Sequence, residues 1–317
     1  MQDVSTLDLP DIERRLGAID LVTLMEDAFS TFSNNGSVVP LPGEMEFGSP
    51  PGEVHIKYGY YLDSDVYVVK IASSFWNNPQ KGLNSSDGVM LVFCKQTGAL
   101  RSVLNDRGRL TDKRTSAAGA VAAKHLALPN PDTIGVLGTG LQAELQVHAL
   151  QSVRPCRRLA VWGRNRERAV DYSQRMSAAG YDVIIADTPA DVARQSRLII
   201  TATSSRAPLL SWEDVQPGTH ITAIGADSAD KQELEVDLVR NADVVVVDSR
   251  VQAASRGEIL HAFASDADKL AKVTEIGDIV SGRAIGRTTD RQITVAAFSG
   301  LAVQDISIAT AVLDCPA

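Results

Sequence analysis

The clearest chemical signal in the sequence is a short glycine-containing loop that follows an apolar run over residues 133–137. Gly138 permits a tight turn, Gly140 lets the backbone approach a pyrophosphate, and Ala143 is small enough for a helix to pack against a strand. The N-terminus of the following helix supplies N–H groups and positive partial charge for phosphates. The loop therefore predicts a binding site for the dinucleotide NAD(P)H. Its predicted ligands are Gly138, Thr139, Gly140, Gln142 and Ala143.

The end of the next predicted strand, over residues 158–162, bears on the choice between NAD and NADP. An NAD site usually ends this strand with Asp or Glu, which binds the ribose hydroxyls. Here Gly163 and Arg164 take that place, and Arg164 can pair with a 2′-phosphate that a carboxylate would repel. This favours NADP without excluding NAD, because Arg164 can also stack on the adenine or face the solvent.

Three charged residues have positions typical of a binding or catalytic site. Arg114 lies near the start of an alanine-rich helix with Thr111 as its expected N-cap, and a cation there opposes the helix dipole unless an anion binds. Lys70 lies in an apolar strand, and burial would lower its pKa and let it move protons. Asp227 follows an apolar run, at the edge where parallel sheets build their sites. The alternatives are a surface arginine, an outward-facing lysine and an aspartate that caps a helix.

A second group of polar residues lies near Lys70 in the predicted sheet. His55 and Lys57 alternate along one strand, so both side chains point to the same face. Ser86 follows in a loop between two glycines. With Arg114, these residues predict a pocket for two carboxylates, and a solvated polar face of the sheet is the alternative.

The elements that must position these residues change in type along the chain. Strands over 54–61, 66–73, 89–94 and 99–105 are linked by hairpins, which predicts an antiparallel sheet after one or two helices over about 19–32. From residue 133, short apolar strands alternate with helices, which predicts a doubly wound parallel sheet of the Rossmann type. A last helix over 300–313 closes the chain. The predicted fold class is therefore α/β with an additional α+β domain.

The composition excludes several classes of protein. The chain has 44% hydrophobic and 22% charged residues with a net charge of −8, and no basic cluster that would suit a nucleic acid. No apolar run is long enough to cross a membrane, and the acidic N-terminus does not resemble a signal peptide. Three widely spaced cysteines predict reduced thiols in a cytoplasmic protein, with no disulfide framework and no metal site.

Several short segments, taken together, resemble the ornithine cyclodeaminase/mu-crystallin family. Their order and spacing make the resemblance specific over nearly the whole chain. The segments are Lys70 within 69–72, Arg114 within 110–115, the loop 138–143, Thr203 within 201–204, Asp227 within 225–234, and 300–305.

The resemblance implies a homodimer in which each chain has two domains. Residues 113–301 would form the Rossmann domain, and residues 1–112 with 302–317 the domain that binds substrate and forms the dimer. Arg114 would bind the carboxylate of a small amino or imino acid, Lys70 its carboxylate or imine, and Asp227 would act as acid or base at the nitrogen. Thr203 and Ser299 are predicted to contact the cofactor.

The family includes ornithine cyclodeaminase, alanine dehydrogenase, imine or ketimine reductases and mu-crystallin, so three hypotheses remain. Residues 39–43 lack an arginine typical of ornithine cyclodeaminases, whereas the segment 55–57 is similar to that of iminosuccinate reductases. The first hypothesis is therefore an NAD(P)H-dependent reductase of a small imino acid such as iminosuccinate. The alternatives are ornithine cyclodeaminase, and alanine dehydrogenase or a ligand-binding protein with little turnover.

Overall fold

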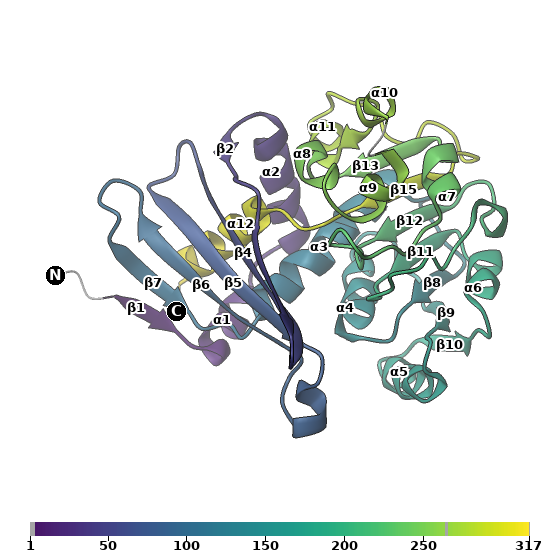
Figure 1. Cartoon of the computed structure of the whole chain (residues 1–317), viewed down its shortest axis with the longest axis horizontal. Helices are drawn as coiled ribbons and strands as arrows, with labels where there is room; N and C mark the ends of the chain where they lie inside the picture. Colours follow the sequence, from purple (N-terminus) through teal and green to yellow (C-terminus); the bar gives the residue numbers. More distant parts are fainter. Residues whose placement is uncertain (1–3, 264–265, 317) are drawn as a thin grey trace. The chain divides into compact units, whose positions relative to one another are not determined.

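The computed structural model of the protein describes residues 4–263 and 266–316. It consists of two compact units (Figure 1), which we call unit 1 (Met1–Arg114 with Leu301–Ala317) and unit 2 (Thr115–Gly300). Unit 1 has a largely antiparallel sheet and unit 2 a parallel one, so the predicted fold class is confirmed. Among the residues just given, no helix is long and apolar enough to cross a membrane.

Unit 1 contains a seven-stranded sheet in the order β1-β7-β6-β5-β4-β2, with β3 also paired to β4. Neighbouring strands are antiparallel except β1, which runs parallel to β7. The predicted hairpin strands are confirmed, whereas the three short or exposed strands β1, β2 and β3 were not predicted. The strands are β1 (Ser5–Leu7), β2 (Ser37–Val38), β3 (Gly43–Gly48), β4 (Pro51–Tyr61), β5 (Val66–Phe75), β6 (Ser86–Cys94) and β7 (Leu100–Leu104); a 3-10 turn, η1 (Asn78–Lys81), precedes β6.

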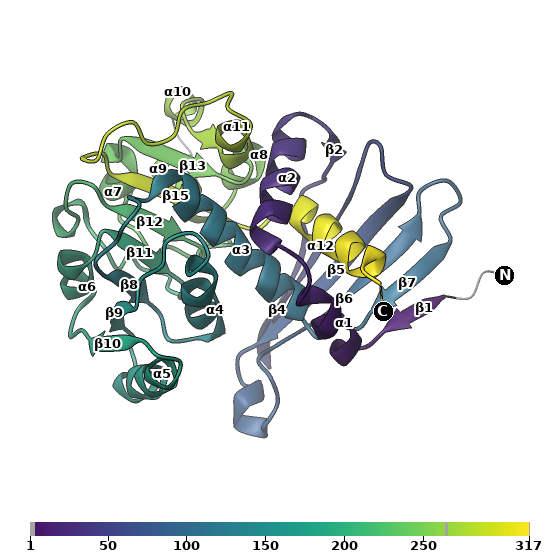
Figure 2. The same cartoon turned by 180° about the vertical axis from the view of Figure 1, so that it is seen from behind.

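Three helices cover one face of this sheet (Figure 2): α1 (Leu9–Leu16), α2 (Leu21–Ser33) and α12 (Ala302–Asp314). The last helix thus packs on strands that lie more than 200 residues earlier, because its apolar side would otherwise face water. Ile306 and Val312 belong to the same buried cluster as Val68 and Met90 of the sheet. Arg15 stabilises the end of α12 by donating hydrogen bonds to its last carbonyl groups.

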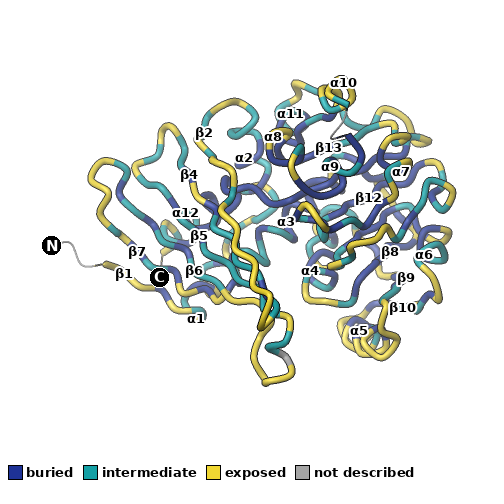
Figure 3. The backbone as a smooth tube through the Cα atoms, in the orientation of Figure 1, coloured by how far each residue is buried: buried dark blue, intermediate teal, exposed yellow. Residues whose placement is uncertain are grey.

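Unit 2 contains an eight-stranded parallel sheet in the order β10-β9-β8-β11-β12-β15-β13-β14. Its central strands are entirely buried, as Figure 3 shows for β8 and β12, because helices cover both faces. The strands are β8 (Ile134–Leu137), β9 (Arg158–Trp162), β10 (Asp182–Ile185), β11 (Leu198–Thr201), β12 (His220–Ala223), β13 (Val244–Val247), β14 (Thr274–Glu275) and β15 (Thr294–Ala297).

Side chains that alternate along these strands build two separate cores. Ile134 and Val136 pack with residues of α3, α4 and α5, whereas Leu137 packs with residues of α6, α7 and α9 on the other face. The helices of unit 2 are the second half of α3 (Arg109–Leu126), α4 (Leu141–Leu150), α5 (Arg166–Ala178), α6 (Pro189–Gln195), α7 (Val236–Asn241), α8 (Arg250–Ala253), α9 (Gly257–Phe263), α10 (Ala267–Leu270) and α11 (Ile276–Val280), with a 3-10 turn η2 (Trp212–Asp214).

The structure corrects one local prediction and adds one strand that was not predicted. Helix α3 begins at Arg109 and not after Thr111, so Thr111 is not its N-cap; Asp106 accepts the hydrogen bond of the Leu110 N–H at 2.8 Å instead. Arg114 therefore lies in the second turn, where the dipole argument is weak. Strand β15 was not predicted, although it is as short and as buried as the predicted strands β11 and β12, and it lies between β12 and β13.

Candidate active site

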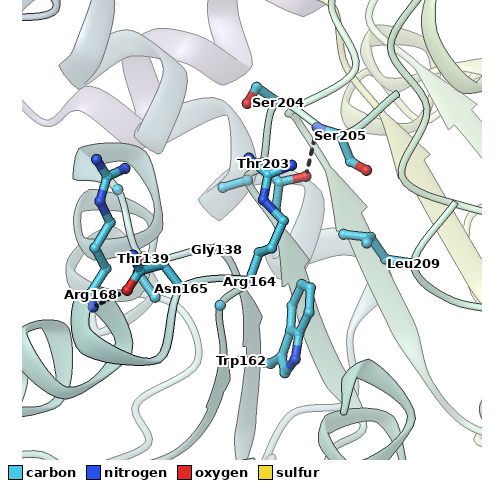
Figure 4. A pocket seen from close by; sticks show the side chains of 13 residues that line it. Gly138, Thr139, Trp162, Arg164, Asn165, Arg168, Thr203, Ser204, Ser205 and Leu209 are labelled. Atoms are coloured by element: carbon cyan, nitrogen blue, oxygen red, sulfur yellow. Dashed lines mark hydrogen bonds between the residues drawn. The ribbon is translucent and has the colours of Figure 1, made fainter. Parts of the chain in front are cut away.

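A cavity of about 260 Å³ lies in unit 2 at the carboxyl ends of β8, β9 and β11 (Figure 4). This is the edge at which open parallel sheets bind nucleotides. The predicted residues Gly138, Thr139, Gly140, Arg164 and Thr203 all lie on its wall. The other lining residues are Trp162, Gly163, Asn165, Arg168, Ala202, Ser204, Ser205 and Leu209.

The glycine loop has the backbone geometry that was predicted for it. Gly138 has a φ of +120°, and a Cβ atom there would lie 2.5 Å from the carbonyl oxygen of Ala202, so only glycine fits. Gly140 is the N-cap of α4, no side chain caps this helix end, and a Cβ atom at Gly140 would meet nothing within 4 Å. The N-terminus of α4 is thus left without a side-chain cap beside an open space at Gly140, which suits a pyrophosphate.

Ala143 and Gln142 lie on α4 outside the lining of this cavity, taken over the residues that the structure describes. Ala143 is fully buried, and its carbonyl group accepts a hydrogen bond of 3.1 Å from the Tyr172 hydroxyl of α5. The small side chain lets α4 approach the sheet and α5, as the loop pattern predicted. Its contribution to the cofactor site is therefore to place the loop.

The wall formed by the end of β9 and the start of α5 carries two arginines (Figure 4). Arg164 was predicted, whereas Arg168 was missed although it lies four residues further on. Asn165 caps α5 by accepting a hydrogen bond from the Arg168 N–H at 3.0 Å, which fixes the start of this helix. Gly163 allows Thr139 to approach, since a Cβ atom would lie 2.6 Å from its methyl group. The wall is therefore cationic and has no carboxylate among the lining residues described.

Thr203 is held by a buried glutamate that sequence reasoning did not identify. Glu233 accepts hydrogen bonds from the Thr203 N–H, the Thr203 hydroxyl and the Thr201 hydroxyl at 2.7 Å each, and from the Gly225 N–H at 2.9 Å. Burial raises the pKa of Glu233, while these four hydrogen bonds act in the opposite direction. The side chain thereby joins the loops after β11 and β12.

A second buried glutamate lies behind the first. Glu258 accepts hydrogen bonds from the N–H groups of Glu233 and Leu234 at 2.7 and 3.1 Å, and burial raises its pKa to about 8. At neutral pH this carboxyl group is therefore mostly protonated, which avoids two adjacent buried negative charges.

Asp227 lies in the loop after β12, as predicted, and its side chain is 37% exposed. The Lys231 ammonium donates a hydrogen bond of 2.7 Å to Asp227 Oδ1, and the Lys231 side chain is only 10% exposed. The next helix, α7, has Glu235 as its N-cap, so the alternative in which Asp227 caps a helix is excluded. Asp227 is thus a partly exposed carboxylate with a fixed cationic neighbour.

Ser299 follows β15 and is 8% exposed. Its hydroxyl accepts a hydrogen bond from Gln252 at 2.7 Å, and its N–H donates to Asp248 at 3.2 Å. Within the described part of the chain it does not line the cavity around Gly138. Its predicted contact with the cofactor remains a prediction.

Unit 1 gathers four buried charged side chains at the start of α12. Lys57 and Lys70 lie opposite each other on β4 and β5. Asp305 Oδ1 accepts a hydrogen bond from Arg114 Nε at 3.0 Å, and Asp305 Oδ2 lies 3.5 Å from Lys70 Nζ. The exposed fractions are 7% for Lys57, 2% for Lys70, 4% for Arg114 and 1% for Asp305. We call these four residues the charged cluster.

The pKa values in the cluster follow from burial and from the mutual charges. Burial lowers the pKa of Lys70 to about 8, with Asp305 opposing this effect and Arg114 adding to it. Burial also opposes the charged form of Asp305, but Arg114, Lys70 and Lys57 outweigh it and lower the pKa of Asp305. A nearby fifth group, Asp106, has a pKa of about 6 because of burial.

His55 and Ser86 are not part of the charged cluster. The His55 ring nitrogens lie 3.5 Å from Glu44 and 3.6 Å from Glu53, so His55 already has two acidic neighbours. Ser86 is exposed at the beginning of β6, four residues before Met90, which is the partner of Lys70 across β5 and β6. Of the four substrate-binding residues that the sequence predicted, the structure thus brings together Lys57 and Arg114.

Comparison with known proteins places the chain in a family. A sequence model described as the ornithine cyclodeaminase/mu-crystallin family matches residues 5–315. The chain belongs to this family. An uncharacterised cyclodeaminase of Sinorhizobium fredii is 35% identical over 92% of this chain and 89% of that protein.

Two solved structures are similar to the chain over nearly its whole length. The Thermococcus litoralis Δ1-pyrroline-2-carboxylate reductase in complex with NADH and L-proline has a TM-score of 0.89 and 28% identity, covering 98% of this chain and 96% of that one. The Paracoccus denitrificans iminosuccinate reductase in complex with NAD+ has a TM-score of 0.85 and 26% identity, with the same coverage. The predicted family resemblance is therefore confirmed.

Proposed function

We propose that this chain is an NAD(P)H-dependent reductase of a dicarboxylic imino acid, iminosuccinate, and that its product is L-aspartate. The observation that carries the proposal is that three buried cationic side chains meet in the charged cluster of unit 1. Lys57, Lys70 and Arg114 come from three different elements and are almost completely buried. One guanidinium and two ammonium groups gathered in one place offer the donors and the charge that a ligand with two carboxylates would use.

The cations have different parts in the proposal. Arg114 binds the carboxylate next to the imine carbon, because a guanidinium offers two parallel hydrogen bonds. Lys57 and Lys70 bind the second carboxylate as point charges. Because the pKa of Lys70 is about 8, its ammonium can also exchange a proton near neutral pH. His55 lies two residues before Lys57 on β4, with Glu44 and Glu53 as neighbours, and its part in binding the substrate stays a prediction.

Asp227 is proposed to pass a proton from water to the nitrogen as the C=N bond is reduced, because the adjacent Lys231 ammonium favours the deprotonated form of Asp227. The addition of a hydride to carbon requires one proton on nitrogen, and a carboxyl group that is 37% exposed can be reprotonated from water. Lys231 holds the carboxylate through its 2.7 Å hydrogen bond and orients it.

The cavity in unit 2 fits the cofactor. Gly138 and Gly140 leave room where a Cβ atom or a capping side chain would stand, and Thr139 and Thr203 line the same space. When bound, the nicotinamide supplies the hydride for the reduction. We propose a preference for NADP, with Arg164 as a ligand of the 2′-phosphate.

Absorbance at the reduced-nicotinamide band tests the reaction. The protein is mixed with NADH or NADPH, ammonium, and either oxaloacetate or pyruvate. Loss of absorbance with oxaloacetate, and aspartate as the product, supports the proposal. A preference for pyruvate would identify an alanine dehydrogenase instead, and proline formed from ornithine without net use of cofactor would identify a cyclodeaminase. Absence of turnover with bound cofactor would leave only a binding function.

Three arginines provide a matched test of cofactor choice. R164A is expected to weaken NADPH binding by about 10-fold or more while changing NADH binding little, because a charged hydrogen bond to phosphate is worth about 1.5–3 kcal/mol. R168A tests the second arginine of the wall in the same way. R166A is the control, since Arg166 pairs with Asp187 at 3.2 Å and does not line the cavity. Equal effects of R164A on both cofactors would exclude a role for Arg164 in 2′-phosphate binding.

The partner proposed for the chain is a second copy, bound through unit 1. Strand β3 is exposed along its whole length and presents the apolar side chains of Met45 and Phe47. A strand of this kind favours association over exposure to water. Light scattering coupled to gel filtration is expected to give twice the mass of 33.9 kDa, and M45E/F47E is expected to give the single mass.

A further inference from the structure

We propose that Asp305 is the positioning residue of the substrate site: it orients the guanidinium of Arg114 and keeps Lys70 charged before any substrate is bound. The inference rests on the proposed function for the roles of Arg114 and Lys70. No role was predicted for Asp305, although it lies in one of the segments that carry the family resemblance.

Asp305 determines which edge of Arg114 a ligand can use. Asp305 Oδ1 accepts a hydrogen bond from Arg114 Nε at 3.0 Å, and Gln304 Oε1 accepts one from Arg114 Nη1 at 3.4 Å. Both partners are 1% exposed and lie in the first turn of α12, so the guanidinium cannot rotate without displacing this turn. The end of the guanidinium formed by Nη1 and Nη2 is then the edge left for the two oxygens of a carboxylate.

The other oxygen of the same carboxyl group faces the lysine. Asp305 Oδ2 lies 3.5 Å from Lys70 Nζ and accepts no hydrogen bond from any residue that the structure describes. Lys70 is 2% exposed and has Lys57 as its direct cross-strand partner. Like charges directly opposite each other are unfavourable in a sheet, so a carboxylate between these strands and Arg114 is needed to keep the lysine protonated.

The position of Asp305 on its helix supports the charged form. It lies in the first turn of α12, where the helix dipole favours a negative charge. The titratable groups that act on Lys70 are Asp305, Arg114 and Asp106, and Asp106 has the smallest effect of the three. Asp106 uses its Oδ2 atom to accept the Leu110 N–H, so it cannot replace Asp305 as the partner of Lys70.

The variant D305N separates a charge role from a packing role. Asparagine keeps an oxygen that can accept from Arg114 Nε, but it removes the negative charge next to Lys70. In the wild type, kcat/KM for oxaloacetate with ammonium is expected to fall above about pH 8, as Lys70 loses its proton. In D305N this fall is expected at a pH lower by about one to three units, since an opposite charge at this distance shifts a pKa by that amount. D106N is the control and is expected to move the fall much less.

A stability measurement tests the same contact without any turnover. The change in urea midpoint caused by D305N is measured in the wild type and in a K70M background. D305N is expected to lower stability less in the K70M background than in the wild type, because in K70M no Lys70 ammonium remains that would lose the charge of Asp305. Equal losses in both backgrounds would overturn the inference, whether or not the protein reduces an imine. If D305N alone does not fold, D305N/K70M is expected to recover folded protein, and failure of both would also overturn it.

Discussion

Replacing Lys70 by methionine is expected to stabilise the protein at neutral pH and to abolish its activity. Methionine has nearly the length of lysine and no charge, and Lys70 is 2% exposed in a sheet next to apolar neighbours. A buried functional charge commonly lowers the stability of the folded protein, because the residue is selected for binding or catalysis and not for stability. The difference in the free energy of unfolding between K70M and the wild type therefore measures how much this buried charge lowers the stability of the protein.

The magnitude follows from the pKa of Lys70. An ordinary lysine has a pKa of 10.5 and Lys70 has one of about 8, and each pKa unit is worth about 1.4 kcal/mol. The unfolded chain thus holds this proton more tightly than the folded one, which lowers the stability of the wild type by about 3 kcal/mol below pH 8. Between pH 8 and 10.5 the folded lysine is neutral while the unfolded one still binds its proton, so the stability of the wild type rises with pH and this loss has disappeared by about pH 10.5.

Urea unfolding followed by circular dichroism at pH 7, 9 and 10.5 measures the effect. K70M is expected to exceed the wild type by about 1–3 kcal/mol at pH 7, since part of the gain is lost with the contact to Asp305. The two proteins are expected to converge towards pH 10.5. K81M, which changes an exposed lysine of the same unit, is the control and is expected to match the wild type at each pH. A K70M protein that is less stable at pH 7, or a gap that does not close with pH, would refute the reasoning.

Two further predictions concern unit 2. G138A is expected to lose NADPH binding and about 1–3 kcal/mol of stability, because its Cβ would lie 2.5 Å from the Ala202 carbonyl oxygen. G140A is expected to lose binding alone, since its Cβ meets no atom within 4 Å. Equal melting temperatures for the two variants would contradict this. E233Q is expected to weaken NADPH binding about 10-fold or more, as measured by fluorescence titration. Both oxygens of Glu233 accept hydrogen bonds from backbone N–H groups, and in glutamine one of these oxygens is replaced by an NH2 group, which would face a backbone N–H donor near Thr203. Unchanged binding in E233Q would show that this carboxylate does not hold the cofactor loop.

The sequence by itself determined the local elements and the loop that they carry. Gly138 and Gly140 could be assigned because a turn with positive φ and a close approach to phosphate admit only glycine, which is a property of the backbone alone. The hairpins of unit 1 and the alternation of strands and helices in unit 2 were predictable for a related reason. The spacing of apolar residues in each segment matches the geometry of one type of element.

Only the tertiary structure decided which charged residues act together. Arg114 and Asp305 are separated by 191 residues and meet because α12 returns to the sheet of unit 1. Glu233 is one polar residue among many in the sequence, and its role depends on the loops after β11 and β12 lying side by side. The acidic neighbours of His55, Glu44 and Glu53, were not predicted, because the contact with Glu44 depends on the pairing of β3 with β4; the role of His55 in binding an anion stays a prediction. Side-chain partners are set by the packing of distant segments, which local periodicity does not encode.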